Sequence, residues 1–258
     1  MSWPYDDLVS GNYLSKVGLP TFTIMVALAI GSKPRLASIM AGLSLISIIM
    51  SVLTGERINF LIRACGGMLA ALAWRPHWRR YIILVVVEIL AVLSVLLFSP
   101  SIQDRYIDKF IESIPTGAHS TYYRDIGAGI VVFKTASLIG IGPATHRYLC
   151  PSIIGENSEL RCNNHAHNFY VQIVSETGIL GLVTGCLMIA GIIWATFAGW
   201  RQNRANVVAA TSFVVPFGLF FPIQSTGDFF GQWNNIFMWS AVALALASAR
   251  TLALEKKK

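Results

Sequence analysis

The sequence predicts an all-α integral membrane protein with about seven transmembrane helices and one long loop between the fourth and the fifth. Hydrophobic residues make up 54% of the chain and charged residues only 13%. The mean hydropathy of +0.58 exceeds that of ordinary soluble domains. Several apolar stretches approach the length of about 20 residues at which a helix crosses a bilayer with its backbone polar groups satisfied internally.

Each predicted span is an apolar stretch bounded by charged residues or turn formers. The seven spans are Val17–Ile30, Leu36–Leu53, Phe60–Trp74, Tyr81–Phe98, Gly178–Trp200, Val207–Gln224 and Phe237–Leu254. We therefore expect a first membrane region at 1–98, a loop or cap at 99–168, and a second membrane region at 169–258.

Basic residues in the short loops predict the orientation, because Lys and Arg near span ends are retained on the cytoplasmic side. Residues 33–35, 75–80, 201–204 and 250–258 carry these charges and fall on one face. The long loop and the N-terminus are then outside. Residues 1–16 hold no apolar segment that could export them, so we expect the chain to be the later part of a longer protein. Unaided translocation of a short tail is the alternative.

The long loop is predicted to contain two amphipathic helices and a disulfide bond. Apolar residues recur at helical spacing in Gln103–Ser113 and in Tyr122–Leu138, and the second helix ends before the glycine-rich run Ile139–Pro143. Cys150 and Cys162 lie on the side that we expect to be oxidising, so a bond between them is expected, with two free thiols as the alternative.

The polar run Cys162–Tyr170 contains His165 and His167, two of the five histidines. Arg57 at the outer end of the third span and Arg124 at the start of the second loop helix could act with them. Each arginine also has a structural explanation, as an anchor at a span end or as a surface ion pair with the next residue. Two histidines without an evident third ligand are weak evidence for a metal, so we predict none.

Three motifs, taken in order, resemble the superfamily of bacterial O-antigen ligases and Wzy-type polymerases, which are polytopic membrane glycosyltransferases. No motif is specific alone, and their order carries the resemblance. They are Thr54-Gly55-Glu56-Arg57 before an apolar segment, Arg124 before a helix and Gly140-Ile141-Gly142, and His167-Asn168 before Gly178-Ile179-Leu180-Gly181. The resemblance covers roughly Gly11 to the C-terminus and looks like the second half of a family member.

This resemblance implies a GT-C-like fold in the bacterial inner membrane, with a periplasmic active face. It implies transfer of a glycan from an undecaprenyl-diphosphate carrier to a hydroxyl of another glycan, of the lipid A core or of some other acceptor. No cofactor and no nucleic-acid partner are implied, and membrane lipid is the surrounding partner. The resemblance further implies a single displacement that inverts the anomeric centre.

The chemistry of the side chains suggests their roles in such a transfer. Arg57 and Arg124 could hold the diphosphate, because a guanidinium stays charged and offers planar donors to phosphate oxygens. A neutral imidazole can accept the proton of the acceptor hydroxyl, so His167 is the predicted general base. His165 is the second choice or an orienting neighbour.

Asn168 and Asp228 are further candidates for substrate binding. Asn168 could contact a sugar, although a cap on the following helix is the simpler role. Asp228 lies on the same predicted face as a tryptophan and two asparagines, which suit hydroxyl-rich ligands. A plain turn between two spans explains it equally well.

The sequence leaves several functions open. We favour an O-antigen ligase-like transferase and rank a polysaccharide polymerase second. A transporter of lipid-linked glycans, with the arginines and histidines lining its path, is an alternative from another class. An inactive remnant of a longer enzyme is the other.

Overall fold

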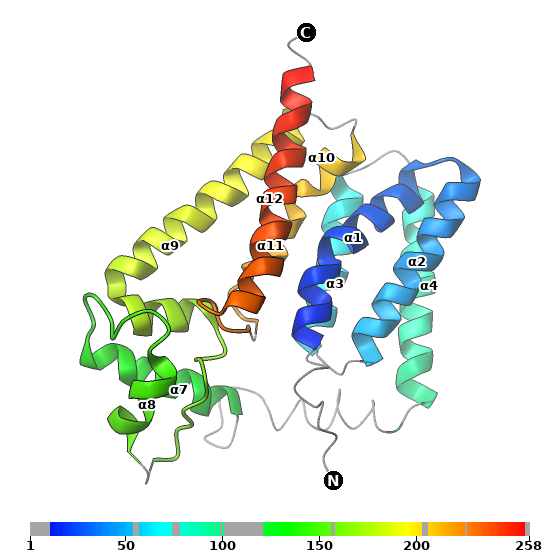
Figure 1. Cartoon of the computed structure of the whole chain (residues 1–258). Helices are drawn as coiled ribbons and strands as arrows, with labels where there is room; N and C mark the ends of the chain where they lie inside the picture. The colour runs from blue at the N-terminus through cyan, green and yellow to red at the C-terminus, as the bar shows by residue number, and fades with distance from the viewer. Residues whose placement is uncertain are drawn as a thin grey trace. The chain divides into compact units, whose positions relative to one another are not determined.

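The computed structural model describes residues 11–53, 57–73, 78–98, 100, 121–155, 158–202, 206–224 and 226–255. Every regular element among these residues is an α-helix, which confirms the all-α class (Figure 1). The chain forms two compact units. The first comprises Met1–Gln103, Gly191–Phe221 and Phe237–Lys258, and the second comprises Asp104–Ala190 and Pro222–Ile236. The division of the chain at residues 98 and 168 stays a prediction.

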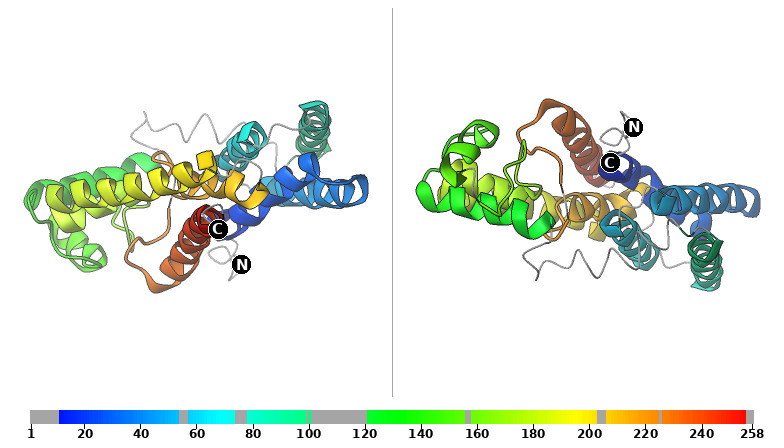
Figure 2. Two further views of the ribbon diagram at one scale, coloured as in Figure 1. Left: turned by 90° about the horizontal axis from the view of Figure 1, so that it is seen from above. Right: turned by 90° about the horizontal axis from the view of Figure 1, so that it is seen from below.

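The first unit is built around four helices that follow one another along the chain. They are α1 (Gly11–Gly31), α2 (Pro34–Leu53), α3 (Arg57–Ala73) and α4 (Trp78–Phe98). Helix α1 packs on α2 and α3, and α4 packs on α2 (Figures 1 and 2). Pro34 begins α2, where a proline costs no hydrogen bond because the first N–H groups of a helix have no partner within it.

Among the residues that the structure describes, three helices are long and apolar enough to cross a membrane: α2, residues Arg79–Phe98 of α4, and α9 (Phe169–Gln202). Shorter apolar stretches occupy Gly18–Gly31 and Phe60–Leu72. Large apolar side chains on α2 and α4, such as Met50, Ile83 and Leu97, are exposed instead of buried. A soluble protein seldom exposes so much contiguous apolar surface, whereas lipid is a suitable neighbour for it. These helices support a membrane protein, and the count of seven spans stays a prediction.

The predicted span Val207–Gln224 is not one helix. The chain forms two short helices, α10 (Val207–Ser212) and α11 (Val214–Leu219), and leaves the helical conformation at Phe220. Pro216 explains the break, because its ring would clash with the carbonyl group of Ser212 in a continuous helix and it has no N–H to donate. The prediction of a single spanning helix here is wrong, since hydropathy records apolar character and not backbone geometry. Residues Gln232–Glu255 form the last helix, α12.

Two ionisable residues of the first unit are held by serines of α2. Arg63 on α3 is buried and donates to the hydroxyl group of Ser47 and to its carbonyl oxygen at 3.3 Å. Glu88 on α4 accepts a hydrogen bond from the Ser44 hydroxyl at 3.1 Å. Both contacts join neighbouring apolar helices through polar groups, as expected for helix packing in a membrane.

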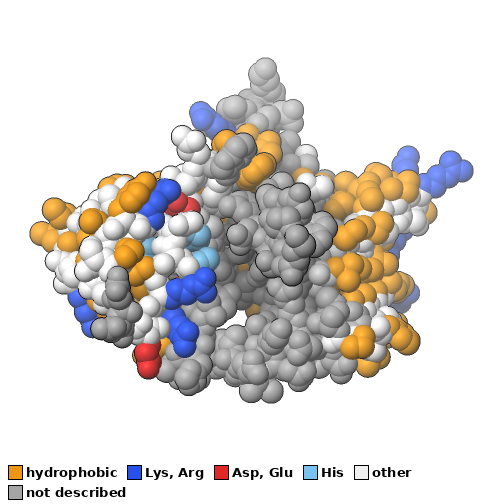
Figure 3. Space-filling view, turned by 60° about the horizontal axis from the view of Figure 1, so that its bottom comes forward, with side chains coloured by type: hydrophobic (Ala, Val, Ile, Leu, Met, Phe, Trp, Pro, Cys, Tyr) orange, Lys and Arg blue, Asp and Glu red, His pale blue; other side chains and the backbone are white. Residues whose placement is uncertain are grey.

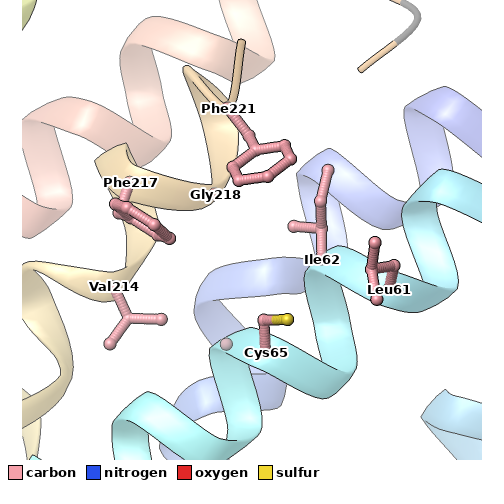
Figure 4. A pocket seen from close by; sticks show the side chains of 8 residues that line it. Leu61, Ile62, Cys65, Val214, Phe217, Gly218 and Phe221 are labelled. Atoms are coloured by element: carbon pink, nitrogen blue, oxygen red, sulfur yellow. The ribbon is translucent and has the colours of Figure 1, made fainter. Parts of the chain in front are cut away.

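Two pockets between described helices of the first unit are lined mainly by apolar side chains. The smaller, of about 20 Å³, lies where Val214 and Phe217 on α11 face Ile62 and Cys65 on α3 (Figure 4). Except for the Cys65 thiol, its described lining offers no polar side chain that could orient a substrate. The larger, of about 270 Å³, is lined by α1 to α4 and has Arg63 and Glu88 in its wall.

The second unit holds α7 (Thr121–Thr135), α8 (His146–Ile154), the first part of α9 and the segment 222–236. Helix α7 confirms the predicted helix Tyr122–Leu138, although it ends three residues earlier, and Gln103–Ser113 lies outside the described residues. Its buried residues Ala128 and Val132 pack with Cys150. Cys150 and Cys162 form the predicted disulfide, with their Cα atoms 5.7 Å apart, which ties α8 to the segment that carries the histidines.

The loop after α7 enters a break in α9. At Gly178 the φ angle is 65° and the helical pattern is interrupted, so backbone groups on both sides of the break are free to bond with the loop. Four hydrogen bonds result: Ile141 N to Ser175 O at 3.3 Å, Gly142 N to Glu176 O at 2.8 Å, Ile179 N to Ser137 O at 2.9 Å, and Leu180 N to Leu138 O at 3.4 Å. We call this contact the glycine junction.

Glycine is required on both sides of the glycine junction. Gly140 has a φ angle of 71°, and a Cβ atom there would overlap the backbone of Glu176 and Thr177. A Cβ atom on Gly178 would overlap the backbone of Leu138 and Ile139 in the same way. Because backbone atoms cannot move aside as a flexible side chain can, neither position accepts a larger residue without separating the loop from α9.

We predict that Gly140→Ala destabilises the protein by about 2–4 kcal/mol, because it adds left-handed backbone strain and a clash with backbone atoms. Gly155→Ala is the matched control, since Gly155 also has a positive φ of 79° but nothing within 4 Å of its Cβ position. Thermal unfolding of both variants in detergent measures the difference. Equal unfolding temperatures would show that the glycine junction does not need this close approach.

Candidate active site

The backbone at His167 is fixed from both sides. Its φ angle of 52° lies in the left-handed region, which is uncommon for a residue other than glycine. Its carbonyl oxygen accepts a hydrogen bond from the Thr226 N–H at 2.9 Å, and α9 begins two residues later. Unusual backbone angles of this kind persist where the surroundings hold them and are frequent at functional sites.

Asn168 provides the cap on α9 that its residue type predicts. Its Oδ1 accepts hydrogen bonds from the N–H groups of Tyr170 and Val171, at 3.0 and 3.2 Å. Its Nδ2 donates to the carbonyl oxygens of Pro222 and Gln224, at 2.7 and 3.3 Å. The side chain therefore joins the start of α9 to the segment 222–236, and its role in sugar binding stays a prediction.

Asp125 on α7 places its carboxylate close to the ring of His167. The His167 Nε2 atom lies 4.0 Å from Asp125 Oδ2, and Asp125 is only 4% exposed. Asp125 Oδ1 accepts a hydrogen bond from Asn163 Nδ2 at 2.8 Å, which fixes the carboxylate. The ring of His165 lies beside that of His167, with centroids 4.4 Å apart, and its Nε2 is 3.0 Å from the Thr226 carbonyl oxygen.

Burial sets the charge state of this pair. It raises the pKa of Asp125 to about 6, although the positive charge of Arg161 opposes the change. Burial, followed by the charges of His165, Arg161 and His146, lowers the pKa of His167 to about 4. At neutral pH the carboxyl is therefore mostly ionised and the imidazole is neutral. An Nε2–H directed at Asp125 would leave the lone pair of Nδ1 available to accept a proton.

Asp228 takes part in a hydrogen-bond network with α9. Its Oδ1 accepts from Gln172 Nε2 at 2.7 Å and from the Phe230 N–H at 3.0 Å, and Gln172 Oε1 accepts from the Phe229 N–H at 2.8 Å. Its Oδ2 lies 3.9 Å from the guanidinium of Arg147. Asp228 thus stabilises the turn that precedes α12, and its contact with a sugar stays a prediction.

Glu176 is fully buried and caps the N-terminus of α8 from a distant part of the chain. Its carboxylate accepts hydrogen bonds from the backbone N–H groups of Ala144 and His146, and from Gln172 Nε2 at 3.3 Å. A carboxylate at this end of a helix is stabilised by unpaired N–H groups and by the helix dipole. Since Glu176 also belongs to the glycine junction, α7, α8 and α9 are joined at one place.

A third histidine, His146, is 1% exposed at the start of α8. Neither of its ring nitrogens has a hydrogen-bond partner among the described residues. Burial, followed by the charge of His165, lowers the pKa of His146, and Asp228 opposes the change. Among the residues that the structure describes, no three His, Cys, Asp or Glu side chains are arranged to hold a metal ion.

The predicted arginines differ in how the structure places them. Arg124 lies in the first turn of α7, half-buried and directly before Asp125. Arg57 begins α3 in the other compact unit, its side chain lies outside the described side chains, and its role stays a prediction. In Figure 3, histidine side chains of the second unit reach the surface between basic side chains.

The sequence did not predict the placement of Asp125 beside His167, because its position directly after Arg124 suggests only an ion pair with that residue. Adjacent residues on a helix point in different directions, so the two side chains do not face each other across the helix surface. Helix geometry alone therefore indicates that the carboxylate of Asp125 contacts a residue other than Arg124. Asn163, Gln172 and Glu176 were also missed as contributors, because their contacts join segments far apart in the sequence.

Comparison with known families identifies the chain. The sequence profile of the O-antigen ligase family matches residues 42–186. The chain belongs to the O-antigen ligase family. The match includes Arg124, Asp125 and His167, and it ends within α9. A search of curated proteins finds no match. As a member of the O-antigen ligase family, the chain is a membrane glycosyltransferase of the ligase or polymerase type, a class whose substrates are glycans and lipid-linked molecules.

We predict that the His167 ring stays neutral from pH 8 down to pH 5 and takes up a proton only near pH 4, because burial and neighbouring positive charges disfavour the imidazolium. NMR titration of the histidine-labelled protein in detergent measures this, with His167→Gln identifying the signal. The unfolded chain, in which histidine titrates at about 6.5, is the reference. Protonation of His167 at or above that value would contradict the described environment.

Proposed function

We propose that this protein transfers a glycan from an undecaprenyl-diphosphate carrier to an acceptor hydroxyl at the periplasmic face of the inner membrane, with His167 as general base. The observation that carries the proposal is the neutral imidazole of His167 beside the buried carboxylate of Asp125. The family match over these residues supports the same reaction class.

The acceptor hydroxyl must lose a proton as its oxygen attacks the anomeric carbon. His167 would take that proton on Nδ1 while its Nε2–H points to Asp125, and the carboxylate would stabilise the imidazolium that forms. Asp125 thus serves as a positioning residue, and Asn163 in turn holds Asp125 in place. A base with a low pKa is a modest proton acceptor at rest, so the nearby carboxylate matters most when the ring becomes charged.

The leaving diphosphate gains negative charge as the glycosidic bond breaks. Arg124 would stabilise that charge, because its guanidinium stays protonated and can donate to two phosphate oxygens at once. Arg57 remains our second proposed donor. Attack on the face opposite the diphosphate would invert the anomeric centre in one step, and His165, Asn168 and Asp228 are proposed to contact the sugars.

We favour a ligase over a polymerase, because the matching profile describes O-antigen ligases. In both reactions the acceptor is a hydroxyl group, so the proposed roles of His167 and Asp125 are the same. The lipid A core is the acceptor that we propose for a ligase, and the growing glycan is the acceptor for a polymerase. Supplying each acceptor separately to the purified protein distinguishes the two.

We predict that His167→Ala lowers the rate of transfer about 10²- to 10⁴-fold, the usual contribution of a general base. Arg124→Ala should lower it as well, because the leaving group loses a charged donor. The assay follows glycan transfer by the purified protein from undecaprenyl-diphosphate-linked glycan to the supplied acceptor. His77→Ala is a control, since the charge rule places His77 on the opposite face of the membrane.

Transfer at the unaltered rate by both His167→Ala and Arg124→Ala would show that the active site is elsewhere. Loss of transfer in His77→Ala to the same extent would show that the effect of replacing a histidine is not specific. A thermal unfolding curve for each variant separates a loss of chemistry from a loss of structure.

A further inference from the structure

Arg161 is held near the His167–Asp125 pair by contacts at three consecutive residues, of which it is the first. Its N–H donates to the carbonyl oxygen of Arg124 at 3.4 Å. The next residue, Cys162, is bonded to Cys150, and the residue after that, Asn163, donates to Asp125. Residues 161–163 are therefore fixed against the first turn of α7, although they belong to a loop.

The side chain of Arg161 is exposed, and no hydrogen bond or ion pair within the described part of the chain takes up its guanidinium. Its positive charge nevertheless acts on both members of the pair, because it lowers the pKa of Asp125 and that of His167. Arg161 is thus close enough to the proposed base to change its proton affinity, while its own donors remain available to a ligand.

A guanidinium that acts on the base through its charge alone suits an anion that comes near the base without contacting it. In a displacement with inversion, the acceptor oxygen and the leaving group lie on opposite faces of the anomeric carbon. The diphosphate is therefore separated from the general base by the width of the reacting centre. Arg161 and Arg124, whose backbones are hydrogen-bonded to each other, can present two planar sets of donors to adjacent phosphate groups.

We propose that Arg161 binds the diphosphate of the lipid-linked donor together with Arg124. Its part in catalysis rests on the proposed transferase function, whereas its binding of a prenyl diphosphate does not. Sequence reasoning assigned the second diphosphate-binding arginine to Arg57 and did not consider Arg161. The constraint that positions Arg161 is tertiary, since it depends on α7, on α8 through the disulfide and on the loop.

The test measures binding of undecaprenyl diphosphate to the full chain in detergent, before any transfer assay. Arg161→Ala should raise the Kd about tenfold, the loss expected for one charge-assisted contact, and Arg161→Lys should restore part of the affinity because it keeps the charge but not the planar donors. Lys134→Ala removes an exposed positive charge from the end of α7 and is the control, with an unchanged Kd.

Two further arms identify the ligand and separate the two proposals. Phosphatidylglycerol, added as a competitor in the micelle, should not displace the diphosphate, and if it does so at equal concentration, Arg161 binds anionic lipid headgroups in general and the proposal is wrong. Transfer assays on the same variants should show kcat/KM for the donor reduced about tenfold or more in Arg161→Ala.

If Arg161→Ala binds undecaprenyl diphosphate and transfers glycan as the unaltered protein does, the inference is overturned while the proposed function stands. If the unaltered protein transfers no glycan but its binding of the diphosphate depends on Arg161, the proposed function fails and the binding site remains. A higher pKa of His167 in Arg161→Ala, measured by NMR, would support the placement of Arg161 near the base. A residue that stabilised the fold from a distance would leave that pKa unchanged.

Discussion

The second compact unit depends on the glycine junction between the loop at Gly140 and the break in α9 at Gly178. Backbone groups that an unbroken helix would have paired internally bond instead to the loop, so the break costs few hydrogen bonds. Both glycines have positive φ angles and both lie against backbone atoms, which makes the close approach possible. The junction fixes where α9 begins relative to α7, and this relation sets the position of the proposed base.

The chemistry of the proposed site follows from that packing. Asp125 is carried by α7 and His167 by the segment before α9, so their separation of 4.0 Å exists only while these elements are joined. The disulfide and the Glu176 cap attach α8 to the same assembly. Burial then leaves a neutral imidazole next to a mostly ionised carboxylate at neutral pH. The same contacts that stabilise the unit therefore set the charge states on which the proposed mechanism depends.

Local rules predicted some features of the molecule and could not predict others. Composition predicted the helical membrane class, and residue type predicted the Asn168 cap. The expectation that the loop is outside, in oxidising surroundings, predicted the Cys150–Cys162 bond. Each of these features depends on neighbouring residues or on the surroundings. The single helix at 207–224 was wrong because Pro216 restricts the backbone in a way that hydropathy ignores. The placement of Asp125 beside His167 was not predicted because it depends on a contact between segments distant in sequence.

The pH dependence of glycan transfer tests the proposed mechanism most directly, because it reports the charge states of His167 and Asp125 during the reaction. As the pH falls through about 6, Asp125 takes up a proton and can no longer stabilise the imidazolium, so kcat/KM should decline below that pH and be constant above it. Asp125→Asn should show a low rate at all pH values and lack this decline. An unchanged rate and pH profile in Asp125→Asn would contradict the claim that the buried carboxylate supports His167 as the base.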